Sequence, residues 1–232
     1  AEYVLFVRER NREREIWDGR RAGPAGAVAE FDADDAFPIG DIDDILPGLI
    51  EGRQRVFYTM GLNHAFDQQV IGWVNRLRAQ ARSGLHPPQE FVALEHVLHD
   101  MRLFKSRSEV ALMRRAGDIA AGAHVRAMRC CRPGRMEYEV MAELLYEFNR
   151  NGADISYHPI VGGGANSCVL HYRDNNARLN DGDLLLVDAG CEYGYYASDS
   201  TRTYPVNGRF TAEQRAIYEV VLEAQRAAIA KV

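Results

Sequence analysis

The hydrophobic pattern of this chain changes near residue 103, and this change limits the folds that the chain can adopt. Before it, short apolar runs typical of strands, such as Tyr3 to Val7, alternate with short helical patterns. After it, Ser106-Arg-Ser-Glu109 has the pattern of a capping box that opens a long amphipathic helix. We therefore predict an α+β protein, with a small α/β domain over residues 1–102 and a second domain over residues 103–232.

The two predicted domains differ in the order of their helices and strands and in the residues that end them. In the first, Asp41 to Leu46 is predicted to form a short helix that Pro47-Gly48 stops. In the second, a helix over Glu137 to Arg150 precedes short apolar runs separated by Gly, Asn and Asp, which indicates a sheet. A last amphipathic helix begins at Thr211 and runs to Val232 without a stop signal. The predicted strands of the sheet are His158 to Val161, Ser167 to His171, Asp183 to Gly190 and Tyr195 to Val206.

Composition argues against several classes of protein. The longest apolar runs are far shorter than the roughly 20 residues that a membrane-spanning helix requires. The net charge of −5 does not favour electrostatic binding to nucleic acid. The four cysteines form no C-x-x-C pair, which is typical of reduced thiols in a chain of this size. We expect a cytoplasmic protein without a nucleic-acid or membrane partner.

Two aspartates are the main candidates for chemistry. Asp188 ends an apolar run, and Asp199 lies eleven residues later, with Gly194 between them. If the two segments form a hairpin that turns at Tyr193-Gly194, the two carboxylates directly oppose each other, with Cβ atoms about 5 Å apart. Like charges at that distance require a cation. Either Arg202 neutralises one aspartate, or one or two divalent metal ions bind between them, and the spacing alone does not decide.

Three histidines are further candidates for site residues. His171 ends a predicted strand and can face the same cleft, as a proton carrier or substrate contact, although a strand histidine is more often structural. His96 and His99 are three residues apart on a predicted helix and resemble a metal-binding pair. They precede the predicted second domain, which contains the two aspartates, so surface or interface positions are favoured for them.

Six blocks of sequence between residue 100 and the end of the chain resemble one known family. That family is the proline-specific aminopeptidases (Xaa-Pro aminopeptidase, or aminopeptidase P), in particular the bacterial members, whose catalytic domain has the pita-bread fold. An Ile-Trp-x-Gly-Arg-Arg block of the family's front domain also resembles Ile16 to Arg21. The six blocks are Met101 to Ser106, Cys131 to Gly134, Ile160 to Gly162, Leu170 to Tyr172, Val187 to Tyr193 and Asp199 to Gly208.

The resemblance implies specific roles. Asp188 and Asp199 correspond to two of five protein ligands of a centre of two divalent metal ions, commonly Mn²⁺. His171 corresponds to a histidine that contacts substrate and helps to move protons without binding the metal directly. Trp17 corresponds to a residue that reaches a neighbouring subunit's cleft, so a homo-oligomer is expected. The remaining ligands, one His and two Glu, are expected beyond Val232.

The resemblance also implies the function. We expect a metallo-exopeptidase that releases the first residue of peptides with proline in the second position, through a metal-activated water. The chain would hold part of the α/β domain and the first half of the pita-bread domain, and would be inactive alone. The alternatives are an Xaa-Pro dipeptidase, or an incomplete or metal-free relative that acts only as a binding module.

Overall fold

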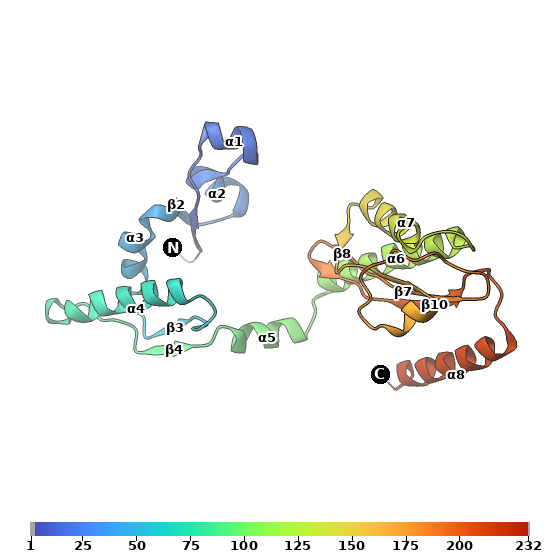
Figure 1. The fold of residues 1–232 in the computed structure, drawn as a ribbon. Coiled ribbons are helices and arrows are strands. Elements are labelled where there is room, and N and C mark those ends of the chain that lie inside the picture. Colours follow the sequence, from blue (N-terminus) through green and yellow to red (C-terminus); the bar gives the residue numbers. More distant parts are fainter. Residues whose placement is uncertain (1–2, 232) are drawn as a thin grey trace. The chain divides into compact units, whose positions relative to one another are not determined.

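In the computed structural model, which describes residues 3–231, the chain divides into two compact units, Ala1–Phe104 and Lys105–Val232 (Figure 1). The division follows directly after helix α5 (Glu95–Leu103). Helices and short strands occur in both units, in agreement with the predicted α+β class. Within residues 3–231, no helix is both long enough and apolar enough to cross a membrane.

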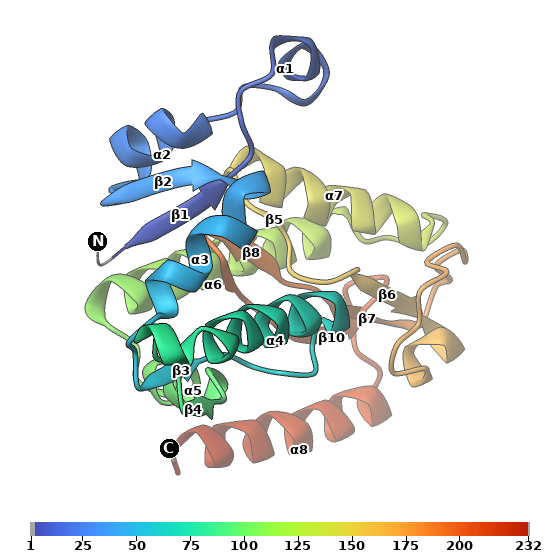
Figure 2. The same ribbon diagram turned by 90° about the vertical axis from the view of Figure 1, so that its left-hand side faces the viewer.

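The first unit contains two separate pairs of parallel strands, β1 with β2 and β3 with β4. Parallel neighbours need a crossover connection, and helices supply it in both pairs. Figure 2 shows α2 beside the β1–β2 pair. The elements of this unit are β1 (Val4–Val7), α1 (Arg12–Asp18), α2 (Gly23–Phe31), β2 (Asp35–Pro38), α3 (Ile42–Ile50), β3 (Arg55–Phe57), α4 (His64–Ala79), β4 (Glu90–Val92) and α5.

Helix α3 continues through Pro47, so the predicted stop at Pro47-Gly48 is wrong. Proline has no N–H to donate to the carbonyl of Asp43, four residues earlier. That carbonyl instead accepts a hydrogen bond from Arg76 Nη1 of α4 at 2.8 Å. The Asp43 carboxylate also accepts from Nε1 of the buried Trp73, at 2.7 Å. Contacts with α4 therefore replace the hydrogen bond that Pro47 cannot make.

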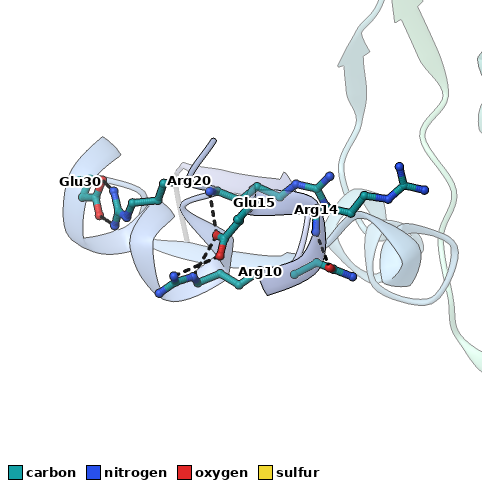
Figure 3. A network of polar contacts seen from close by, with 7 residues as sticks. Arg10, Arg14, Glu15, Arg20 and Glu30 are labelled. Carbon is teal, nitrogen blue, oxygen red and sulfur yellow. Dashed lines mark hydrogen bonds and ion pairs between the residues drawn. The ribbon is translucent and has the colours of Figure 1, made fainter. Parts of the chain in front are cut away.

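Trp17 lies near the end of α1, and its side chain is 84% exposed. Ion pairs hold the segments that precede and follow Trp17 in the sequence (Figure 3). Glu15 Oε1 lies 3.2 Å from Arg10 Nε, and Glu30 of α2 accepts from Arg20 Nη1 at 2.8 Å. The hydrogen bond from Arg10 is the main reason why the pKa of Glu15 falls below its ordinary value. The contact of Trp17 with a neighbouring subunit remains a prediction.

The second unit contains two antiparallel sheets of three strands, in the orders β10-β7-β6 and β5-β8-β9. Two long helices, α6 and α7, pack against each other and against these strands (Figure 1). The elements are α6 (Arg107–Cys130), α7 (Glu137–Arg150), β5 (Asp154–Ile155), β6 (Ile160–Gly163), β7 (Leu184–Asp188), β8 (Cys191–Tyr193), β9 (Tyr196–Ala197), β10 (Thr201–Pro205) and α8 (Ala212–Ile229).

The core of the second unit lies between the helix pair and the strands. The predicted capping box opens α6, because Ser106 Oγ accepts from the N–H of Glu109 and the Glu109 carboxylate accepts from the N–H of Ser106. One stripe of α6 consists largely of small buried residues, and α6 is in contact with α7. The core residues include Ala116, Ala123 and Ala127 of α6, Leu144 and Phe148 of α7, and Leu185 and Val187 of β7.

Two predicted elements of the second unit differ from the structure. The segment Ser167 to His171 is not a strand: a 3₁₀ turn, Gly164–Cys168, follows β6, and His171 lies in the turn after it. Gly164 has a φ of +54°, a left-handed conformation that cannot continue a strand. The last helix, predicted to run to Val232, ends at Ile229, and Val232 itself lies outside the described residues.

Candidate active site

The hairpin between the two aspartates turns one residue later than predicted. Strands β8 and β9 are joined through Gly194 and Tyr195, whose φ angles are +56° and +69°. Two successive positive φ angles are typical of the tight turn that matches the twist of a hairpin. This turn pairs Asp188 with Thr201, so the prediction that Asp188 directly opposes Asp199 is wrong.

The shift in register keeps both aspartates on one face. Moving the turn by one residue moves the pairing by two, and side chains alternate between faces with a period of two. Asp199 lies between β9 and β10. The N–H of Ser198 donates to the carbonyl of Cys191 at 2.8 Å, so in the same antiparallel register the next residue, Asp199, lies opposite Gly190. A Cβ atom at Gly190 would overlap the backbone oxygen of Ser198. Glycine at this position therefore lets the two segments that carry the aspartates approach each other.

A tyrosine hydroxyl joins the two carboxylates. Tyr157 Oη lies 2.5 Å from Asp188 Oδ1 and 2.8 Å from Asp199 Oδ1. Burial, followed by these two hydrogen bonds, raises the pKa of Tyr157, which keeps the phenol protonated. One hydroxyl has one proton to donate, so it satisfies only one of the two carboxylates at a time. The carboxylate that does not receive the proton is therefore left available to a cation.

The three predicted site residues line one cavity. It has a volume of about 310 Å³ and opens beside the two carboxylates. A larger hollow of about 750 Å³ lies between α6 and α7, among arginines, and none of the predicted site residues lines it. The smaller cavity is thus the candidate active site, although it is not the larger of the two. Its lining residues are Tyr157, His158, Ile160, His171, Arg173, Asp188 and Asp199.

Arg202 does not neutralise the aspartates, which removes the simpler alternative for the pair. Its Nη1 donates to the hydroxyl of Ser200 and to the carbonyl of Thr201, at 3.1 and 2.7 Å. No ion pair links Arg202 to a carboxylate within residues 3–231. Among residues 3–231 the two carboxylates share the Tyr157 hydroxyl and no cationic side chain, and carboxylates are suitable ligands for a hard divalent ion. In the described part of the chain, however, no three His, Cys, Asp or Glu side chains form a group that could hold one.

His124 is a functional candidate that the sequence pattern did not single out. It belongs to the apolar stripe of α6, is 3% exposed, and its Nε2 lies 3.3 Å from the carbonyl oxygen of Ala189, directly after Asp188. Burial lowers its pKa, so the ring is neutral. A polar side chain within an otherwise apolar stripe was the only available signal. The exposed His96 and His99 lie on α5 in the other unit and join no metal-binding group among residues 3–231.

Comparison with known proteins supports the predicted resemblance. Residues 111–232 match the model of metallopeptidase family M24, and residues 1–58 match the aminopeptidase P N-terminal domain. The chain belongs to metallopeptidase family M24. It is 47% identical to the Xaa-Pro aminopeptidase of Escherichia coli over 222 residues, which are 95% of this chain and 50% of that protein. It is 40% identical to the Xaa-Pro aminopeptidase of Haemophilus influenzae, over 97% of this chain and 50% of that protein.

The M24 chain also resembles solved aminopeptidase structures. Pseudomonas aeruginosa aminopeptidase PepP matches with a TM-score of 0.93 and 60% identity, over 97% of this chain and 51% of that one. Zn-substituted E. coli aminopeptidase P in complex with product matches with a TM-score of 0.92 and 45% identity, over 96% and 51%. The predicted fold, an aminopeptidase P front domain followed by part of a pita-bread domain, is confirmed. The chain spans about half the length of the relatives that it matches.

Proposed function

We propose that this chain belongs to a metal-dependent aminopeptidase that releases the first residue of peptides with proline in the second position. The observation that carries the proposal is the convergence of Asp188 and Asp199 on the Tyr157 hydroxyl, in a cavity that His171 also lines. The names of the relatives supply the substrate class, since they are Xaa-Pro aminopeptidases. The same names favour this activity over that of an Xaa-Pro dipeptidase.

In this proposal each site residue has a distinct role. Asp188 and Asp199 would be protein ligands of two divalent ions, for which we propose Mn²⁺. When bound, such ions activate water and polarise the peptide carbonyl. His171 lies exposed on the cavity wall, where an imidazole can contact substrate and carry a proton. Tyr157 orients the two carboxylates by its hydrogen bonds, and an oriented carboxylate is a better metal ligand.

We also propose the domain boundaries, the oligomeric state, the substrates and the location of the enzyme. The N-terminal α/β domain would cover residues 1–102 and the first half of the pita-bread domain residues 103–232, in a homo-oligomer that brings Trp17 to a neighbouring cleft. The substrates would be peptides. All four cysteines are free thiols, which supports a reducing, cytoplasmic location.

The proposal is tested by replacing the two carboxylates in an active aminopeptidase that contains this chain. Asp188→Ala or Asp199→Ala should lower bound metal and reduce turnover of an Xaa-Pro-Xaa peptide by roughly 100-fold or more, because a metal centre loses its geometry with one ligand. Asp118→Ala, an exposed position on α6, is the control and should leave turnover unchanged. Normal turnover in either site variant would refute the assignment. A preference for Xaa-Pro dipeptides over longer peptides would indicate a dipeptidase.

A further inference from the structure

The first residue of α7, Glu137, is a carboxylate that is completely buried. Within residues 3–231 it forms no ion pair with a lysine, arginine or histidine. Burial of a carboxylate without a cation is costly unless hydrogen bonds satisfy its oxygens. A residue in this situation requires a structural or functional explanation.

Four donors surround the Glu137 carboxylate, and they are arranged in two matching pairs. Oε1 accepts from the backbone N–H of Gly163 at 2.8 Å and from Asn166 Nδ2 at 3.1 Å. Oε2 accepts from the backbone N–H of Ala177 and from the Tyr172 hydroxyl, both at 2.9 Å. A carboxylate offers about four lone-pair sites, so these donors fill its capacity.

The four donors all belong to residues 163–177, a segment that carries His171 and that we call the His171 loop. Gly163, the last residue of β6, lies at its start, Ala177 lies at its end, and Tyr172 directly follows His171. The backbone N–H of Glu137 also donates to the carbonyl of Ala177 at 3.0 Å, which makes the tie at the end of the loop reciprocal. Glu137 therefore joins both ends of the loop and its middle at a single point.

His171 has no hydrogen bond of its own to another residue in the described part of the chain, so its backbone neighbours determine where it lies. We propose that Glu137 is the positioning residue that fixes His171 on the wall of the candidate active site. The inference rests on the proposed function, because it assigns Glu137 no chemistry of its own. Glu137 acts on the reaction only through the place of the imidazole.

The geometry dictates which substitution is informative. In Glu137→Gln, one carboxylate oxygen becomes an NH₂ group of nearly the same size. Asn166 and Tyr172 can reorient, but each oxygen of Glu137 also faces a backbone N–H, of Gly163 or of Ala177, which cannot. Either orientation of the amide therefore leaves one backbone donor without an acceptor. The variant loosens one end of the loop and creates no cavity.

The test is a double-mutant cycle in an active aminopeptidase that contains this chain. In the presence of His171, Glu137→Gln should lower kcat by roughly 10- to 100-fold with little change in KM, since a misplacement of about 1 Å can cost this much. In the His171→Ala background the same substitution should change kcat by less than about 2-fold, because the group that it positions is gone. The decrease in Tm should be the same in both backgrounds.

The matched control is Glu139→Gln on the same turn of α7. Among the hydrogen bonds of residues 3–231, the Glu139 carboxylate accepts from the backbone N–H of Met136, at 2.7 Å, and from no residue of the His171 loop. The Glu139→Gln substitution should leave kcat unchanged. Should Glu137→Gln fail to fold, Tyr172→Phe removes one of the four donors and should lower kcat in the same His171-dependent way.

Each outcome of the cycle is decisive. An equal decrease in kcat with and without His171 means that Glu137 has only a structural role, which overturns this inference alone. Normal turnover in His171→Ala overturns the proposed role of His171, and this inference with it. Normal turnover in Asp188→Ala as well would remove the proposed function itself.

Discussion

At the scale of single residues, the Tyr157 hydroxyl cannot donate its one proton to Asp188 and Asp199 at the same time. We predict that Tyr157→Phe destabilises the metal-free protein at pH 7 by about 1–2 kcal/mol, because two neighbouring carboxylates lose their shared donor. Saturating Mn²⁺ should reduce this loss, since a cation neutralises the same pair. Thermal unfolding with and without Mn²⁺ measures both effects.

The control for this prediction is Tyr138→Phe on α7, where the ring is 50% exposed. It should have no effect with or without the ion. A loss in Tyr157→Phe that is the same in both conditions would contradict a shared cation site.

The residues that could be predicted at this scale are those with local sequence signals. Asp188, Asp199 and His171 stand in recognisable blocks, and the structure places all three on one cavity. Tyr157 and Glu137 could not be predicted in the same way. Tyr157 meets aspartates that are 31 and 42 residues away, and Glu137 binds donors up to 40 residues away. Such partners are brought together only by the packing of the sheet against α6 and α7.

At the scale of elements, the start of α6 is linked to strand β9 through Glu109. A hydrogen bond from the Tyr196 hydroxyl, followed by bonds from the backbone N–H and side chain of Ser106, holds the pKa of Glu109 at about 2, below its ordinary 4.5. A lowered folded-state pKa adds stability above pH 4.5 that is lost as pH falls towards 2. We predict that Glu109→Gln lowers the unfolding midpoint in denaturant at pH 6, and that its difference from the unsubstituted protein shrinks at pH 3.

The control for the Glu109 prediction is Glu223→Gln on α8. This carboxylate is exposed and makes no hydrogen bond to another described residue, so the unfolding midpoint should match that of the unsubstituted protein at both pH values. If Glu109→Gln has the same effect at pH 6 and pH 3, the ionised carboxylate does not link α6 to β9.

The elements themselves were predictable where their signals are local, and their limits were not. The predicted capping box at Ser106 opens α6, and the last helix begins directly after Thr211, in agreement with its predicted start. The stop expected at Pro47 failed because Arg76, on another helix, supplies the missing partner. The register of the hairpin was wrong because Tyr195, and not only Gly194, adopts a positive φ. In each case a contact or conformation outside the local pattern decided the boundary.

At the scale of the whole molecule, the described residues offer few ligands for metal. Asp188 and Asp199 are the two carboxylates that converge, and residues 3–231 contain no group of three or more potential ligands. Helix α8 has no buried residue, and its Ile217, Val220 and Val221 are each more than 60% exposed. The chain spans about half the length of the relatives that it matches.

We therefore predict that the polypeptide of residues 1–232 binds Mn²⁺ only weakly, with a Kd on the order of 1 mM, and does not hydrolyse Xaa-Pro peptides at a significant rate. Hard divalent ions take six or more oxygen ligands, and activation of water depends on fixed coordination that two carboxylates cannot provide. Titration of the free Mn²⁺ signal by electron paramagnetic resonance measures the affinity, and Asp188→Asn/Asp199→Asn is the control that should abolish even this binding. Release of the first residue from an Xaa-Pro-Xaa peptide is assayed on the same sample. Micromolar affinity with rapid Mn²⁺-dependent release would show that residues 1–232 contain a far more complete site than the two aspartates.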